Sequence, residues 1–163
     1  MTLPAWALKG NIVYGNWYDN LVTEYFGHTG GISVEALLCG TTNVILSNTK
    51  SIEAHKAAPN AGVTQKFMDQ YGWTTNSIFN RSAMWKSGMT ATQRNFVAAY
   101  QATYIGKSYF FYTGKTDLNK WYCSKLQWYA YKQALGIDVD SNGGDIVFPT
   151  DILNSPLLVG MSF

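Results

Sequence analysis

The sequence predicts one α+β domain in which an antiparallel, barrel-like sheet packs against a helix that carries a cysteine. Short β-prone segments separated by glycines fill the first third of the chain, which is typical of hairpins. Two longer segments with helical spacing follow after residue 90, and the second contains Cys123 near its start. The 163 residues, of which 47% are hydrophobic, suffice for one core and therefore predict a single domain over residues 1–163.

The predicted strands are short β-prone runs bounded by turn signals. Four such runs are expected, at residues 11–14, 28–38, 44–47 and 51–54. Turns separate the later runs, at residues 39–41 and 48–50. Gly30 and Gly31 lie within the second run, where they allow another element to approach the backbone closely. We therefore expect a small antiparallel sheet of hairpins.

The two predicted helices have clear start and stop signals. The first begins at Thr90 or Thr92, either of which can serve as its N-cap, and ends at Gly106. Its residues at helical spacing are Phe96, Ala99, Tyr100 and Thr103. The second spans residues 121–135 and has Gly136 at its C′ position. Its i, i+3, i+4 stripe comprises Leu126, Tyr129, Ala130, Gln133 and Ala134.

The remaining segments connect these elements. We expect a short helix or a loop at residues 20–26, a short helix at 65–71, a loop at 74–88, an extended run at 108–112, an acidic loop at 138–145, a last strand at 146–148 and an apolar tail packed on the body. Asp138, Asp140 and Asn142 are spaced like part of a calcium loop. The closing Glu at the twelfth position is absent, so we predict no calcium site.

Composition excludes several classes of protein. Charged residues are only 13% of the chain and aromatic residues 15%, so the polar surface is rich in Tyr, Trp, Asn and Thr. Such a surface is typical of proteins that contact carbohydrate or peptide polymers, and equally of exported proteins of low charge. The net charge of +2 is spread over scattered basic residues, which argues against a nucleic-acid partner. No run approaches the ~20 apolar residues of a transmembrane helix.

Cys123 lies at or near the first turn of the second predicted helix. A helix N-terminus carries about half a positive charge and unpaired N–H groups, which lower the pKa of a thiol and can bind an oxyanion. The alternative is that Cys123 is a small buried hydrophobic residue, or that it forms one disulfide with Cys39. Trp121 and Tyr122 come directly before it and either shape a cleft and contact the substrate or pack as ordinary aromatic residues.

A cysteine nucleophile needs an imidazole and a third group that orients the imidazole. His28 opens a predicted strand next to Gly27, and the alternative for it is a hydrogen-bonded structural histidine. Glu35, Glu53 and His55 are candidates for the third group. Glu35 is disfavoured because its odd offset from His28 puts it on the other strand face. Glu53 is preferred to His55 because a carboxylate also stabilises an imidazolium.

These segments resemble the circularly permuted NlpC-type papain-fold hydrolases, often called YiiX-like. Nearly the whole chain takes part, and the matching segments are Gly10-Asn11-Ile12, Gly27-His28-Thr29-Gly30-Gly31-Ile32, Ile52-Glu53-Ala54, Gly62-Val63, Ile105-Gly106-Lys107-Ser108-Tyr109 and Trp121-Tyr122-Cys123-Ser124-Lys125-Leu126-Gln127-Trp128-Tyr129-Ala130-Tyr131. The Cys123 segment is the most specific of these. Lys125 stands where the family usually has Glu.

The resemblance implies a papain-like fold and a cysteine peptidase or amidase with Cys123 as nucleophile, His28 as base and Glu53 as third residue. The implied substrate is a peptide or amide bond, above all in bacterial cell-wall peptidoglycan. No cofactor or metal is implied, and a monomer is expected. We expect an extracytoplasmic location (secreted, periplasmic or cell wall). Residues 1–10 lack signal-peptide features, so any leader is expected to be absent from this chain. The alternative is that the protein stays in the cytoplasm.

Two other functions remain open. One is a lipid amidase, thioesterase or acyltransferase of the lecithin retinol acyltransferase-like type, which an apolar groove beside Cys123 would favour. The other is a non-catalytic wall- or glycan-binding domain, which a Cys123 buried away from His28 would favour.

Overall fold

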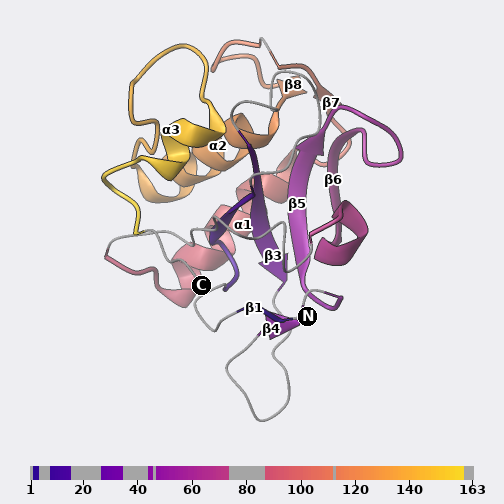
Figure 1. Cartoon of the computed structure of the whole chain (residues 1–163). Coiled ribbons are helices and arrows are strands. Elements are labelled where there is room, and N and C mark those ends of the chain that lie inside the picture. Colours follow the sequence, from indigo (N-terminus) through magenta and orange to yellow (C-terminus); the bar gives the residue numbers. More distant parts are fainter. Residues whose placement is uncertain are drawn as a thin grey trace.

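Figure 1 shows the computed structural model of the chain, in which two long helices lie against a four-stranded antiparallel sheet. The structure describes residues 2–3, 8–15, 27–34, 44–45, 47–73, 87–111 and 113–159. The expected short helix or loop at residues 20–26 lies outside this range, as do nearly all of the loop at 74–88, Glu35 and Cys39.

The sheet is built from β2 (Ile12–Gly15), β3 (His28–Val34), β5 (Lys50–His55) and β6 (Gly62–Phe67) in that spatial order. Each pair of neighbours is antiparallel, and the register of β3 against β5 shifts between Ile32 and Val34. Among the described strands the sheet is open, with β2 and β6 at its edges, and the barrel-like form stays a prediction.

Three helices, one 3₁₀ helix and four short strands complete the described fold. The helices are α1 (Ala91–Thr103), α2 (Cys123–Leu135) and α3 (Pro149–Leu153), and the 3₁₀ helix η2 covers Met68–Tyr71. Two further two-stranded pairs are β1 (Thr2–Leu3) with β4 (Val44–Ile45), antiparallel, and β7 (Ser108–Tyr109) with β8 (Lys120–Trp121), parallel. Among the described residues, no helix has both the length and the apolar character needed to cross a bilayer.

Helix signals in the sequence are confirmed at both ends of the long helices. Thr90, not Thr92, is the N-cap of α1: its hydroxyl accepts a hydrogen bond from the Gln93 N–H, and the Gln93 side chain accepts one from the Thr90 N–H. Gly136 ends α2 in the left-handed conformation, with φ of 69°. Helix α2 begins at Cys123, two residues later than the residues 121–135 that the sequence predicts.

Three sequence predictions are wrong about local structure. Residues 62–67 form a strand, so the expected helix at 65–71 is confined to η2; as an edge strand, β6 has few buried positions to mark it. Residues 146–148 form no strand, and α3 follows them with Pro149 at its first position. Phe96 is 53% exposed, because α1 buries Val97, Ala98 and Gln101 instead.

Helices α1 and α2 lie against the same face of β3 and β5. Gln101 of α1 donates a hydrogen bond to Gln127 of α2, and Gln127 donates one to the Ile52 carbonyl of β5. A Cβ atom at Gly31 would collide with the ends of both glutamine side chains, so glycine here leaves room for their hydrogen bond. The apolar core beside them consists of Ile52, Ala54, Val63, Trp121 and Leu126.

Candidate functional site

Cys123 is the first residue of α2 and has a free thiol, so no disulfide joins it to Cys39. The N-cap residue, Tyr122, makes no side-chain hydrogen bond to the first turn. The first turn also lacks an acidic residue. The first-turn N–H groups of α2, at the positive end of the helix dipole, can therefore interact with the sulfur or with a group bound beside it.

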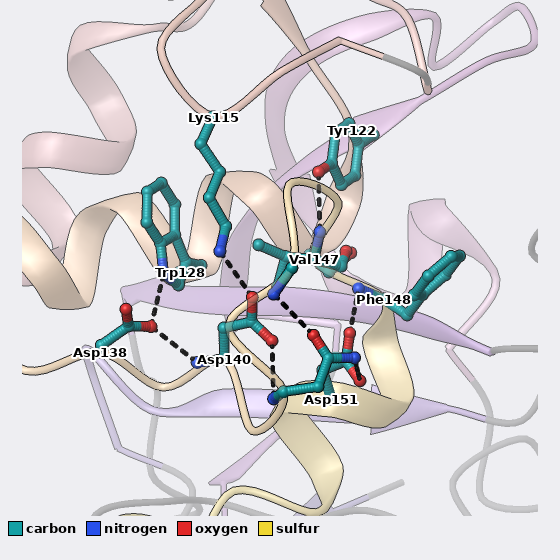
Figure 2. Close-up of polar contacts among 11 residues, drawn as sticks. Lys115, Tyr122, Trp128, Asp138, Asp140, Val147, Phe148 and Asp151 are labelled. Atoms are coloured by element: carbon teal, nitrogen blue, oxygen red, sulfur yellow. Dashed lines mark hydrogen bonds and ion pairs between the residues drawn. The ribbon is translucent and has the colours of Figure 1, made fainter.

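The chain after α2 fixes the residues on either side of Cys123. Figure 2 shows the Val147 N–H donating to the Tyr122 hydroxyl at 3.0 Å. The Ser124 hydroxyl donates to the Val147 carbonyl at 2.5 Å. The same segment is held further along by Asp151, which accepts from the Phe148 N–H at 2.8 Å (Figure 2). Two backbone groups of one residue thus anchor the start of α2.

A buried lysine fixes the chain before α2. Lys125 is fully buried, and its ammonium donates to the carbonyls of Gly114, Asp117 and Lys120 at 2.8, 2.5 and 2.9 Å. It also lies 4.9 Å from the centre of the Trp121 ring. Burial lowers the pKa of Lys125 to about 8. Lys125 stands where the resembled family usually has Glu, and its ammonium hydrogen-bonds three backbone carbonyls.

His28, the first residue of β3, lies close enough to the Cys123 side chain for each group to shift the pKa of the other. Burial alone would lower the pKa of His28, but the negative charge of Cys123 and its hydrogen bond, followed by those of Glu53, outweigh burial and raise the pKa to about 10. For Cys123, burial alone would raise the pKa; attraction to His28, with hydrogen bonds from His28 and Thr29, lowers it. Both shifts favour a thiolate–imidazolium pair.

Glu53 orients His28 from the neighbouring strand. His28 Nε2 donates to Glu53 Oε2 at 2.8 Å, which leaves Nδ1 as the ring nitrogen for the sulfur. Glu53 is fully buried, and burial alone would raise its pKa; hydrogen bonds and charge from His28 and His55 lower it to about 2. The carboxylate is therefore ionised and can hold an imidazolium. The structure thus brings together the three residues that the sequence predicts.

Three more side chains hold the Glu53 carboxylate. Its Oε2 also accepts from His55 Nε2 at 2.8 Å, and its Oε1 accepts from Ser51 at 2.5 Å and from Trp73 Nε1 at 2.7 Å. Ser51, Glu53 and His55 alternate along β5 and so lie on one face of it.

Glycine is needed opposite this carboxylate. A Cβ atom at Gly30 would lie 2.6 Å from Glu53 Oε1 and 2.9 Å from its Cδ, well inside van der Waals contact. Only a residue without a side chain lets Glu53 reach across β3 to His28.

Trp121 and Tyr122 are both fully buried. The Trp121 indole N–H donates to the Leu118 carbonyl at 3.0 Å, and the Tyr122 hydroxyl accepts from Val147 as described. These contacts fit the packing alternative, and a contact of either residue with substrate stays a prediction.

Sequence reasoning missed Thr29, Ser51 and Trp73. Thr29 follows His28 directly, is buried beside the sulfur, and its polar groups help to lower the pKa of Cys123. Ser51 carries a usable signal, since it lies two positions before Glu53 on the same strand. Trp73 follows η2, and nothing in its spacing predicts that its indole N–H meets Glu53.

A cavity of about 520 Å³ lies beside the later turns of α2 and not at Cys123. It is lined by Lys115, Thr116, Leu118, Trp128, Tyr129, Lys132, Gln133, Asp138 and Gly143. None of the residues around Cys123 lines it. Figure 2 shows three of its lining residues, with Trp128 donating to Asp138, and Lys115 paired at 2.6 Å with Asp140, which does not line the cavity.

Comparisons with known proteins give a relative by sequence and a neighbour by structure. No family model matches the chain. The chain is 29% identical over 153 residues to the uncharacterized protein YycO of Bacillus subtilis (strain 168), which covers 90% of this chain and 52% of YycO, so the chain spans about half the length of that relative. It is also similar to the crystal structure of the metalloprotein YiiX from Escherichia coli O157:H7, with a TM-score of 0.67, 16% identity and coverage of 94% of this chain and 96% of that one. The chain therefore has a YiiX-like α+β fold.

Proposed function

We propose that this protein is a cysteine hydrolase of papain-like, permuted NlpC type that cleaves an amide or peptide bond with Cys123, His28 and Glu53. The contact between Cys123 at the start of α2 and His28 on β3, with Glu53 behind the imidazole, carries this proposal. A non-catalytic binding domain needs no such arrangement of buried, ionised groups. Perturbed groups that are mutually arranged as nucleophile, base and orienting residue are typical of an active site.

The reaction begins from the thiolate–imidazolium pair. The Cys123 sulfur attacks the carbonyl carbon, and the carbonyl π electrons move to its oxygen. His28 gives its Nδ1 proton to the leaving amine as the C–N bond breaks, which yields a thioester and a neutral imidazole. His28 then takes a proton from water while the water oxygen attacks the thioester. Collapse of that intermediate breaks the C–S bond and restores the ion pair.

Two features of the chain stabilise the charged groups that form during the proposed reaction. The uncapped N–H groups at the start of α2, that of Cys123 included, can donate to the oxyanion of both tetrahedral intermediates. Glu53 remains ionised throughout and stabilises the imidazolium, since its pKa is held at about 2.

A metal ion bears on the mechanism because YiiX is named a metalloprotein. In the described part of the chain, His28, Glu53 and His55 carry ligand atoms within 4.8 Å of one another. Both Nε2 atoms, however, lie 2.8 Å from Glu53 Oε2 and donate to it, so N–H groups and not lone pairs face the space between the three residues. The residues as arranged do not fit a metal ion, and no step uses one.

The proposed substrate is a peptide or amide bond of bacterial peptidoglycan, in keeping with the low charge of the chain and its abundant Tyr, Trp, Asn and Thr. Purified muropeptides and fatty-acyl amides or esters, offered in parallel, separate this proposal from the lipid amidase or acyltransferase alternative. We expect new amines from muropeptides only. Turnover of the acyl lipids alone would contradict the proposed substrate.

The proposed nucleophile is tested by alkylation at neutral pH. Because only 1% of Cys123 is exposed, the small reagent iodoacetamide is suitable. We expect Cys123 to label much faster than Cys39, as followed by mass spectrometry of the two peptides. Cys123→Ala should abolish hydrolysis with an unchanged melting temperature, and Cys39→Ser should keep full activity. Equal, slow labelling of both thiols would contradict the proposal.

A further inference from the structure

The carboxylate behind His28 is shared with a second histidine. His28 Nε2 and His55 Nε2 each donate to Glu53 Oε2 at 2.8 Å, and their ring centroids are 4.5 Å apart. Both rings and Glu53 are buried, with 2% exposure or less. Two donors on one oxygen compete, because each withdraws charge that the other would otherwise receive.

His55 is held firmly in this position. Its ring stacks on Tyr71 of η2, with centroids 4.9 Å apart and planes 8° apart. The Tyr71 hydroxyl is in turn hydrogen-bonded to Thr64 of β6 at 2.6 Å. His55 is therefore clamped between the carboxylate on its own strand and an aromatic ring from outside it.

The other Glu53 oxygen does not need His55 for its position. Ser51 and Trp73 already donate to Oε1, and an indole N–H can only donate. The carboxylate would stay in place without His55, but the whole charge on Oε2 would then act on His28. His55 therefore affects how tightly His28 holds its proton more than where Glu53 lies.

We infer that His55 is a positioning residue of the site, which acts through Glu53: by donating a second hydrogen bond to Oε2 it limits the basicity of His28. This inference rests on the proposed function. In that reaction His28 must accept a proton from water and return one to a leaving amine in each cycle. A carboxylate that acted on His28 alone would slow the second of these transfers.

Several groups face His28 and His55 and influence the pKa of His28. They are Cys123 of α2, which contacts His28, then Glu53 and Ser51 of β5, Thr64 of β6, Tyr71 of η2, and Trp73. Of these, the Cys123 thiolate raises the pKa of His28 the most. Removing the sulfur therefore exposes the contribution of Glu53 to measurement.

The test uses the imidazole signals of the untagged 163-residue chain, labelled with ¹⁵N-histidine, in the Cys123→Ala background. The chain has two histidines, so replacing His55 leaves one signal, that of His28. His55→Phe keeps a ring to stack on Tyr71 but lacks the donor. We expect the pKa of His28 to rise by about one unit in His55→Phe. His55→Gln, whose amide N–H can replace Nε2–H, should bring it back to the parent value.

A second donor-less variant and a comparison of alkylation with hydrolysis extend this test. If His55→Phe fails to fold, His55→Leu gives the same comparison. With Cys123 present, the donor-less variant should alkylate at the parent rate but hydrolyse amides about tenfold more slowly, because only hydrolysis needs the proton on His28 to leave. Ile52→Val, which alters the opposite face of β5, controls for lost stability and should keep the parent rates.

Two results would overturn the inference: an unchanged or lower pKa of His28 in a folded donor-less variant, or no recovery in His55→Gln. The titration needs no substrate. A chain that hydrolyses nothing would therefore refute the proposed function without deciding the role of His55, which the titration decides separately.

Discussion

Replacing Glu53 by Gln changes one atom of the site, and the surrounding donors dictate the result. The Trp73 indole can only donate, so the new carbonyl oxygen must take the Oε1 position. The amide NH₂ then faces His28 and His55. Both imidazoles must turn their Nε2 atoms into acceptors, which leaves His28 neutral with its one proton on Nδ1 and removes the anion that stabilises the imidazolium.

The free energy at stake follows from the pKa of Glu53. A decrease from 4.5 to about 2 corresponds to on the order of 3 kcal/mol of folding free energy. Because the folded pKa lies below the unfolded one, this stabilisation is complete above pH ~4.5 and is lost as the pH falls toward 2. Urea denaturation should show wild type more stable than Glu53→Gln by about 3 kcal/mol at pH 7.

The pH dependence gives the sharper test, since other carboxyls are common to both proteins and cancel in the comparison. The difference in unfolding free energy should shrink steadily between pH 4.5 and 2.5. Hydrolysis at pH 7 should fall by about 10²–10⁴-fold, the range for loss of a working acid–base group. A difference below about 1 kcal/mol at pH 7, or one that stays constant down to pH 2.5, would refute the reasoning.

Four further changes test other parts of the structure. Gly30→Ala should displace the Glu53 carboxylate, so that both the melting temperature and hydrolysis fall together; wild-type activity in this variant would contradict the close approach. Lys125→Met should destabilise the protein by about 2–4 kcal/mol in urea, because three carbonyls lose their donor, and a neutral result would show that they find others. Thr90→Ala should cost about 1 kcal/mol by the same assay through loss of the α1 cap, whereas Thr92→Ala should not. Prolonged dialysis against EDTA should change neither the melting temperature nor hydrolysis. Loss of hydrolysis in EDTA and its recovery on adding zinc would contradict the conclusion that His28, Glu53 and His55 do not hold a metal ion.

The sequence predicts those elements whose signals are local. The Thr90 cap, the Gly136 stop and the strands around residues 12 and 52 depend on neighbours within a few positions. Strand β6 is not predicted because an edge strand pairs on one side only, so a polar run serves it well. The buried face of α1 is misjudged because its central contact is made by Gln101, a polar residue that finds its partner on α2.

The site follows the same division. Cys123 is predictable from its place at a helix start, and Glu53 and His55 from their alternation on one strand. Trp73 and Thr29 are not, since their roles depend on where η2 and α2 pack against the sheet. The burial of Trp121 and Tyr122 likewise depends on the remote segment around Val147.

The chain order of the two reactive groups also affects when the site can exist. The imidazole and its carboxylate are synthesised early, whereas the sulfur and the segment that anchors its helix come from the last quarter of the chain. A ribosome-bound intermediate, or a fragment cut before α2, holds the proposed base without the proposed nucleophile. The proposed hydrolysis is thereby withheld until α2 and the segment around Val147 have been synthesised.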